Sequence, residues 1–201
     1  MNLSRPQCSG DEDLPGAKLS LDLAWLPRVQ ADALFEALRQ EIPWETHRIR
    51  MFGREVDSPR LSCWIGDEAA VYTYSGTRFE PRPWPTSLLA VRQRLARELG
   101  VGFNSVLANL YRSGRDAMGW HSDDERELGP EPVIASLSLG AARRFVLKSR
   151  DDPRLKREFL LPHGSLLVMA GQTQGHYRHS LPRTARLVGE RINLAFRQLL
   201  V

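Results

Sequence analysis

The chain has 201 residues, of which 42% are hydrophobic and 26% charged, a composition typical of one globular domain that needs no disulfide staples. The two cysteines, Cys8 and Cys63, have no metal-ligand spacing, and no apolar run suits a signal peptide or a membrane span. The net charge is +4, and 25 of the 28 basic side chains are arginine, which favours a polyanionic partner. We expect a soluble intracellular protein.

The first half of the chain predicts a loose arm and two helices. Residues 1–20 have the composition of an N-terminal arm, and residues 21–201 are expected to form a single domain. Residues 30–41 and 87–99 carry apolar side chains every three or four positions, which is the helical period. Gly100 supplies the stop signal for the second helix.

The second half predicts short strands. Turn residues such as Gly114, Gly140 and Gly171 separate six segments rich in Val, Leu, Ile and Phe. These segments are 103–111, 133–139, 144–148, 158–161, 165–169 and 191–199. Helices followed by a run of strands predict an α+β, mostly β fold, with the helices packed on the outside of a jelly roll.

The sequence His121-Ser122-Asp123 is the sharpest local signal for a metal. Residues i and i+2 of an extended segment point to the same side, so His121 and Asp123 can reach one ion. Two imidazoles and one carboxylate on one face leave coordination sites open, as in non-haem iron(II) oxygenases. A solvated His-Asp hydrogen bond is the ordinary alternative. The second imidazole can come from His163, His176 or His179; His163 suits a turn before Gly164, and spacing does not choose between the other two.

The last predicted strand carries polar side chains on one face. Arg191, Asn193 and Arg197 alternate with apolar residues at the period of a strand, and Asn109 and Tyr111 share a face in an earlier segment. If the polar face points into a barrel, two guanidiniums can hold the carboxylates of a small dicarboxylic acid. The alternative is a half-buried strand whose polar face lies in water.

These residues fall within a series of motifs that resembles the AlkB family of iron(II)- and 2-oxoglutarate-dependent dioxygenases, most closely the branch that repairs duplex DNA. The resemblance runs in family order from about Arg48 to the C-terminus. The matching stretches are Asn109-Leu110-Tyr111, His121-Ser122-Asp123-Asp124-Glu125, Ile134-Ala135-Ser136-Leu137-Ser138-Leu139-Gly140, His163-Gly164-Ser165-Leu166-Leu167, His179-Ser180-Leu181-Pro182 and Arg191-Ile192-Asn193-Leu194-Ala195-Phe196-Arg197.

The resemblance implies a double-stranded β-helix (residues 103–201) that uses Fe(II), 2-oxoglutarate and O2. It makes His179 the third metal ligand, with His121 and Asp123. It also implies that 2-oxoglutarate binds the polar strand residues described above, namely Asn109, Tyr111, Arg191, Asn193 and Arg197. Ala195 departs from the family, which usually has threonine there, so one hydroxyl is missing from the polar face.

The implied reaction is oxidative demethylation of N-alkylated bases in DNA, such as 1-methyladenine and 3-methylcytosine, releasing formaldehyde, succinate and CO2. The same dioxygenase chemistry on RNA, a protein side chain or a small molecule is the first alternative. A nucleic-acid-binding module with a dead site is the second, and the presence of all three ligands and both arginines disfavours it. We expect a monomer without membrane association, cytoplasmic in a bacterium or nuclear in a eukaryote, acting on double-stranded DNA, single-stranded DNA or RNA.

Residues 48–84 resemble the family's nucleotide-recognition lid. Phe52 and Gly53, with arginines including Arg60 nearby, suit a hairpin tip that pushes an apolar wedge between bases; a hairpin with one core aromatic is the alternative. Tyr72, Tyr74 and Ser75 match the substrate lid, where the tyrosines can contact a flipped base or simply pack within a strand. The remaining substrate candidate is the carboxylate of Asp124, which suits a cationic methylated base; otherwise it is a solvated loop acid.

Overall fold

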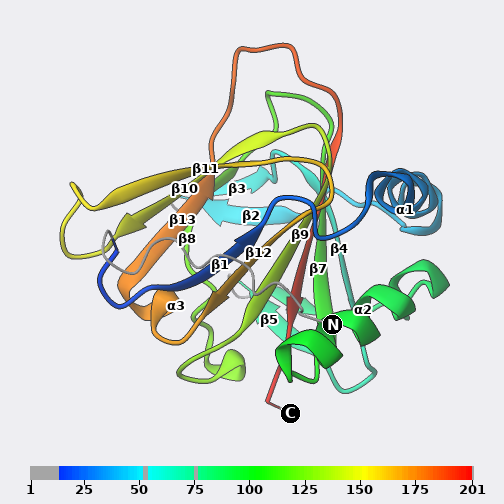
Figure 1. Cartoon of the computed structure of the whole chain (residues 1–201), viewed down its shortest axis with the longest axis horizontal. Coiled ribbons are helices and arrows are strands. Elements are labelled where there is room, and N and C mark those ends of the chain that lie inside the picture. Colours follow the sequence, from blue (N-terminus) through cyan, green and yellow to red (C-terminus); the bar gives the residue numbers. More distant parts are fainter. Residues whose placement is uncertain (1–13, 52–53, 75–76, 201) are drawn as a thin grey trace, which may run out of the picture.

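Two antiparallel β-sheets face each other in the computed structural model, which describes residues 14–51, 54–74 and 77–200 (Figure 1). The strand order is β1–β12–β9–β14–β7–β4 in the larger sheet and β11–β10–β13–β8 in the smaller one. The bounds are β1 Lys18–Asp22, β4 Leu61–Gly66, β7 Ser105–Tyr111, β8 Met118–His121, β9 Ile134–Gly140, β10 Arg143–Ser149, β11 Lys156–Leu161, β12 Ser165–Ala170, β13 Tyr177–Leu181 and β14 Arg191–Arg197. This arrangement confirms the predicted jelly roll.

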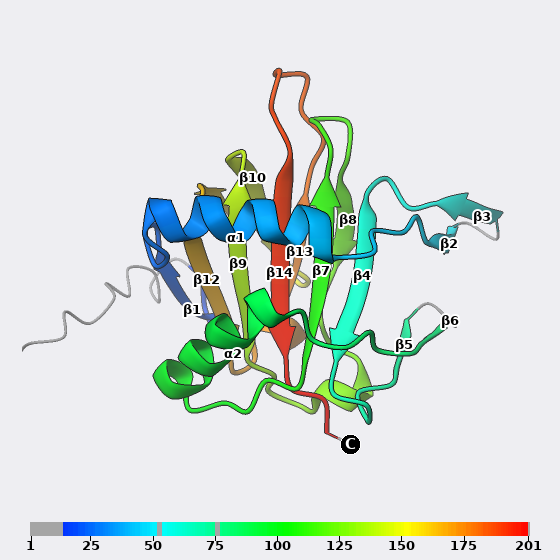
Figure 2. The same ribbon diagram turned by 90° about the vertical axis from the view of Figure 1, so that its right-hand side faces the viewer.

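Helices α1 (Arg28–Glu41) and α2 (Thr86–Leu99) cover the outer face of the larger sheet (Figure 2). Their buried stripes, which include Leu38 and Leu95, belong to one apolar cluster with the outward-facing residues of β9 and β14. The left-handed backbone of Gly100, with φ of 67°, ends α2 as the sequence predicted. The helical period thus placed both helices, because their apolar stripes are what the sheet buries.

Two short hairpins extend beyond strand β4, the edge of the larger sheet (Figure 2). The first pairs β2 (Arg48–Met51) with β3 (Arg54–Asp57), and the second pairs β5 (Tyr72–Tyr74) with β6 (Thr77–Phe79). A 3-10 turn (Arg126–Leu128) and the short helix α3 (Thr173–His176) complete the elements. None of the helices within the described ranges combines the length and apolarity that a membrane crossing needs.

Several strands were not predicted. The arm expected over residues 1–20 ends earlier than predicted, because Leu14 is buried and β1 begins at Lys18, where it pairs with β12. Strand β4 lies within the expected lid, residues 48–84, yet it pairs with β7 as part of the larger sheet. Strands β8 and β13 were missed because they are short and carry polar functional residues, which removes the apolar alternation that marks a strand.

Candidate metal centre and cosubstrate cavity

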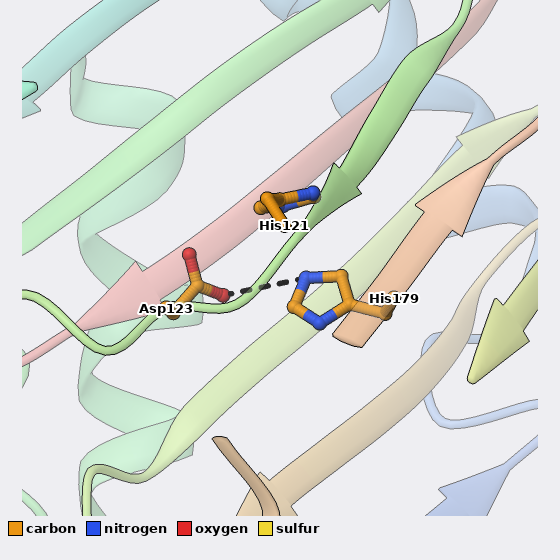
Figure 3. Close-up of side chains that lie close together, drawn as sticks. All are labelled: His121, Asp123 and His179. Carbon is orange, nitrogen blue, oxygen red and sulfur yellow. Dashed lines mark ion pairs between the residues drawn. The ribbon is translucent and has the colours of Figure 1, made fainter. Parts of the chain in front are cut away.

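Strand pairing brings the three predicted metal ligands together. His121 is the last residue of β8 and lies opposite His179 of β13, while Asp123 follows β8 by two residues. One ligand atom from each residue lies within 4.8 Å of the others, and Nε2 of His179 is 3.6 Å from Oδ2 of Asp123. Figure 3 shows the three side chains pointing toward one another from β8, the following loop and β13. This is the facial arrangement of two imidazoles and one carboxylate.

The other two candidate histidines lie elsewhere. Nδ1 of His163 accepts a hydrogen bond from the backbone amide of Gly140 (2.7 Å), and its Nε2 lies 3.1 Å from Oδ1 of Asp32. His176 is the last residue of α3, with its ring against Gly16. The position of His163 before the left-handed Gly164 agrees with the turn role that the sequence suggested.

Burial and neighbouring charges prepare the triad for a cation. Burial, followed by the neighbouring His121, lowers the pKa of His179 to about 3, so its imidazole is neutral at physiological pH. Burial also lowers the pKa of His121, whose Nδ1 lies 2.9 Å from the carbonyl oxygen of Gly119; a hydrogen on Nδ1 leaves Nε2 to ligate. Burial alone would raise the pKa of Asp123, but Arg197 and the two histidines lower it, so the carboxylate is ionised.

Two contacts fix the metal-binding carboxylate. Arg197 donates from Nη2 to Oδ1 of Asp123, which leaves Oδ2 on the side of His179. The backbone amide of Asp123 donates to Oε1 of Gln174 (3.0 Å), a residue of α3 that is almost completely buried. Gln174 could not be found from the sequence, because a glutamine in a short helix has no distinctive pattern.

The predicted cosubstrate residues line the same cavity as the triad. The cavity lies between the two sheets, and its polar wall is formed by Asn109, Tyr111, Arg191, Asn193 and Arg197 together with His121, Asp123 and His179. The apolar wall includes Met118 and Phe145. The ring of Phe145 stacks on that of His179, with 5.3 Å between the ring centroids. The polar face of β14 therefore points inward, and the solvent-facing alternative is wrong.

Arg191 offers a charged fork to this cavity. The residue is 1% exposed, and its Nη2 donates to Oγ of Ser138 (2.9 Å). Burial lowers its pKa to about 10, against an opposing effect of Tyr111, so the guanidinium stays charged near neutral pH. Among the described residues, its Nε and Nη1 have no hydrogen-bond partner. A buried cation with two unused donors is a site for a carboxylate.

The neighbouring positions add neutral donors and acceptors. Nδ2 of Asn193 donates to Oγ of Ser136 (2.8 Å), and Ser136 lies opposite Ala195 in the pairing of β9 with β14. The hydroxyl of Ser136 therefore lies beside the position where the family usually has threonine. Ser136 and Ser138 were not among the predicted site residues, although their spacing of two residues places both hydroxyls on one face of the strand.

The predicted substrate residues are only partly described. Phe52, Gly53 and Ser75 lie outside the described residues, while Tyr72 and Tyr74 begin and end strand β5. These roles stay predictions.

Two other substrate candidates have clear positions. Arg60 is buried just before β4, where its Nε donates to Oδ1 of Asn109 (2.7 Å) and its Nη1 to Oγ of Ser58 (3.1 Å). Asp124 is about half exposed and paired with Arg150, so it is not an unpartnered loop acid. Their substrate roles also stay predictions.

The residues present fit iron(II) and 2-oxoglutarate. The triad supplies nitrogen and carboxylate ligands on one face, and Arg191 supplies unused donors in the same cavity. A metal and a carboxylate-bearing chelator can therefore be held side by side.

Comparisons with known proteins agree with this geometry. The sequence model of the 2OG-Fe(II) oxygenase superfamily matches residues 20–197. DNA oxidative demethylase ALKBH2 of Mus musculus is 40% identical over 86% of this chain and 77% of its own length. Alpha-ketoglutarate-dependent dioxygenase alkB homolog 3 of Bos taurus is 38% identical over 84% of this chain and 61% of its own length. The solved structure of OsALKBH1 has a TM-score of 0.58 at 18% identity, covering 92% of this chain and 98% of the other, which supports the fold.

The family match spans nearly all of the jelly roll, including the metal triad and both arginines of β14. This chain belongs to the AlkB family within the 2OG-Fe(II) oxygenase superfamily and is a dioxygenase dependent on iron(II), 2-oxoglutarate and O2.

Proposed function

We propose that this protein is an oxidative demethylase that removes N-methyl groups from bases in double-stranded DNA, such as 1-methyladenine and 3-methylcytosine. The observation that carries the proposal is the convergence of the triad and the arginine-lined polar face on one cavity. The printed name of the ALKBH2 relatives, DNA oxidative demethylase, supports DNA as the substrate class.

His121, Asp123 and His179 would hold the iron, and Arg191 would hold the distal carboxylate of 2-oxoglutarate. Bound together, iron(II) and 2-oxoglutarate supply oxidation by O2, which releases succinate and CO2 and hydroxylates the N-methyl group so that it leaves as formaldehyde. Asn109, Tyr111 and Asn193 would orient the cosubstrate from the polar wall. The apolar wall around Phe145 would limit the access of water to the reacting groups.

A base inside a duplex must leave the stack before it can reach a buried cavity. The two hairpins lie beyond β4 at the edge of the larger sheet, a position that supports a role in contacting nucleic acid (Figure 2). We assign the wedge to Phe52 and Gly53, which connect β2 to β3, and the contact with the flipped base to Tyr72, Tyr74 and Ser75. Asp124 would face the cationic edge of the methylated base.

We further propose that the protein acts as a monomer. Its expected location is the compartment that contains the DNA, which is the cytoplasm of a bacterium or the nucleus of a eukaryote. One cavity within a single chain contains both the proposed metal ligands and the cosubstrate residues. No second copy is needed to complete that group of residues.

The test is release of formaldehyde and succinate. The purified protein would receive iron(II), ascorbate, 2-oxoglutarate and duplex oligonucleotides carrying 1-methyladenine or 3-methylcytosine. Matched single-stranded DNA and RNA would be assayed in parallel, with His121→Ala as the control. We expect formaldehyde and succinate in equal amounts with duplex DNA, and none with the variant. Succinate without formaldehyde would move the substrate outside methylated nucleic acid, and faster turnover of RNA would replace DNA in the proposal.

A further inference from the structure

The loop that carries Asp123 is not held by the strand ladder. Strand β8 ends at His121, and its pairing with β13 shifts register between His179 and Leu181. Arg197 and Gln174 hold Asp123 itself, so the residues on either side of it, Ser122 and Asp124, need contacts of their own to keep the loop in place. A carboxylate displaced by about 1 Å gives poor coordination, because metal–ligand distances must fall within about 0.2 Å of their usual values.

Arg150 supplies those contacts. Its Nη2 donates to Oγ of Ser122 (2.7 Å) and to Oδ2 of Asp124, the residues on either side of the metal-binding aspartate. The same nitrogen lies 3.3 Å from the carbonyl oxygen of Gln174. One guanidinium thus holds the loop from both sides of Asp123 and connects it to α3.

The same residue is tied to the segment that leads into His179. The backbone amide of Arg150 donates to the carbonyl oxygen of His176 (2.9 Å), the last residue of α3 and the one before β13. Ser122 adds a second connection, since its hydroxyl donates to the carbonyl oxygen of Tyr177 (2.7 Å) while accepting from Arg150. The bonds that the Arg150 guanidinium donates to Ser122 and Asp124 are charge-assisted, and such bonds are shorter and stronger than bonds between neutral groups.

We propose that Arg150 is a positioning residue of the metal centre, which holds the loop containing Asp123 against the segment that leads into His179. Its partners lie on both sides of the triad, and the ion pair with Asp124 holds the loop on its exposed side. Residues that orient metal ligands in this way typically contribute about 10–100-fold to metal affinity.

The inference rests on the proposed metal centre, so the first measurement separates the two. Co(II), standing in for iron(II), would be titrated alone into wild type and His121→Ala, with ligand-field absorption reporting coordination. We expect binding by wild type and loss of binding by His121→Ala. Equal binding by both would overturn the metal centre and this inference with it.

The second measurement tests Arg150 itself. We expect Arg150→Ala to bind Co(II) about tenfold more weakly, with shifted ligand-field bands. Arg150→Lys should recover part of the affinity, because the ammonium keeps a positive charge beside Asp124 but lacks the reach and planar geometry with which the guanidinium bonds both Ser122 and Asp124. The matched control is Arg154→Ala, since Arg154 is exposed in the same connection and bonds Asp152; it should bind Co(II) like wild type.

Stability is followed on the same samples by thermal unfolding. A purely structural role would lower Tm in Arg150→Ala and leave the Co(II) affinity of the folded protein unchanged, which would overturn the inference. If Arg150→Ala does not fold, Ser122→Ala and Arg150→Lys decide by the same criterion. Weaker Co(II) binding in both, with their folds intact, supports the positioning role, and wild-type affinity in both rejects it.

Discussion

Arg197 donates a hydrogen bond to the Oδ1 atom of Asp123, although the two residues lie 74 positions apart in the chain. Both side chains are almost completely buried, and Oδ2 of Asp123 faces His179. The resemblance to the AlkB family had assigned Arg197 to 2-oxoglutarate. In the structure its guanidinium also orients the carboxylate of Asp123. One residue therefore links the predicted metal ligands with the predicted cosubstrate residues.

Replacing Arg197 with glutamine is expected to weaken Co(II) binding about tenfold even when no 2-oxoglutarate is present. The reason is that the Asp123 carboxylate loses the charge that holds it in place. Titration of the metal alone provides the measurement. Unchanged Co(II) affinity, with weaker 2-oxoglutarate binding, would assign Arg197 to the cosubstrate only.

Arg191→Gln is expected to behave in the opposite way, with normal Co(II) affinity but weak cosubstrate binding. A charged hydrogen bond contributes about 1.5–3 kcal/mol, so the Kd for 2-oxoglutarate should rise about tenfold to a hundredfold. Calorimetric titration of 2-oxoglutarate into the Co(II)-loaded protein measures this directly. Arg144→Gln is the control, because Arg144 is exposed and pairs with Glu158. Equal Kd values for wild type and Arg191→Gln would remove Arg191 from the cosubstrate site.

Restoring the usual threonine at position 195 tests whether the missing hydroxyl matters. Ala195 lines the cavity and lies opposite Ser136. A threonine hydroxyl at this position could therefore bond either Ser136 or bound 2-oxoglutarate. One added hydrogen bond contributes about 1 kcal/mol, which corresponds to about a fivefold lower KM for 2-oxoglutarate. Steady-state succinate release measures the change. A KM equal to that of wild type would show that Ser136 already fills the role.

The Phe52 wedge is tested by comparing substrates. Phe52→Ala should lower turnover of duplex oligonucleotides about tenfold, since opening a base pair costs a few kcal/mol and the wedge offsets part of that cost. Single-stranded oligonucleotides, which need no wedge, should be demethylated at the wild-type rate. Val29→Ala serves as the control because Val29 is an exposed apolar residue on α1. Equal losses on both substrates would argue for a packing role.

Asp116, which is not one of the metal ligands, is expected to make the free energy of unfolding depend on pH. Burial would raise its pKa, but hydrogen bonds from the Arg112 side chain and backbone amide outweigh burial and lower it. A folded-state pKa below the unfolded value of about 3.9 stabilises the fold above that pH, and the contribution disappears as pH falls through the folded pKa.

Asp116→Asn should therefore cost about 1 kcal/mol at pH 7, which lowers Tm by about 2–4 °C in a chain of this size. The difference from wild type should shrink as the pH falls below about 4. Thermal unfolding of the metal-free proteins at several pH values checks this. Asp57→Asn, whose carboxylate is largely exposed and lies 3.8 Å from Arg48, should stay at the wild-type Tm. A difference that is constant with pH would mean that the charge of Asp116 contributes nothing.

The two long helices and most strands of the second half could be predicted from the sequence, because apolar spacing records which face an element buries. The period of two in the sequence of β14 by itself separates Ile192 and Leu194 from Arg191 and Asn193. The short motif His121-Ser122-Asp123 likewise placed two ligands on one side. Local patterns carry such information because they depend on neighbours within a few residues.

Tertiary structure decided what local patterns left open. The direction of the polar face of β14 became definite once two sheets enclosed it, since both faces of an inner strand are covered. Residue spacing alone does not choose between His179 and His176. The pairing of β13 with β8, which joins segments 58 residues apart, places His179 opposite His121. The contacts of Arg150, Gln174 and Arg197 with the metal loop join residues distant in the chain, and no periodicity records such pairs. Composition and spacing thus determined the elements and the chemistry available, while packing determined which of those groups meet.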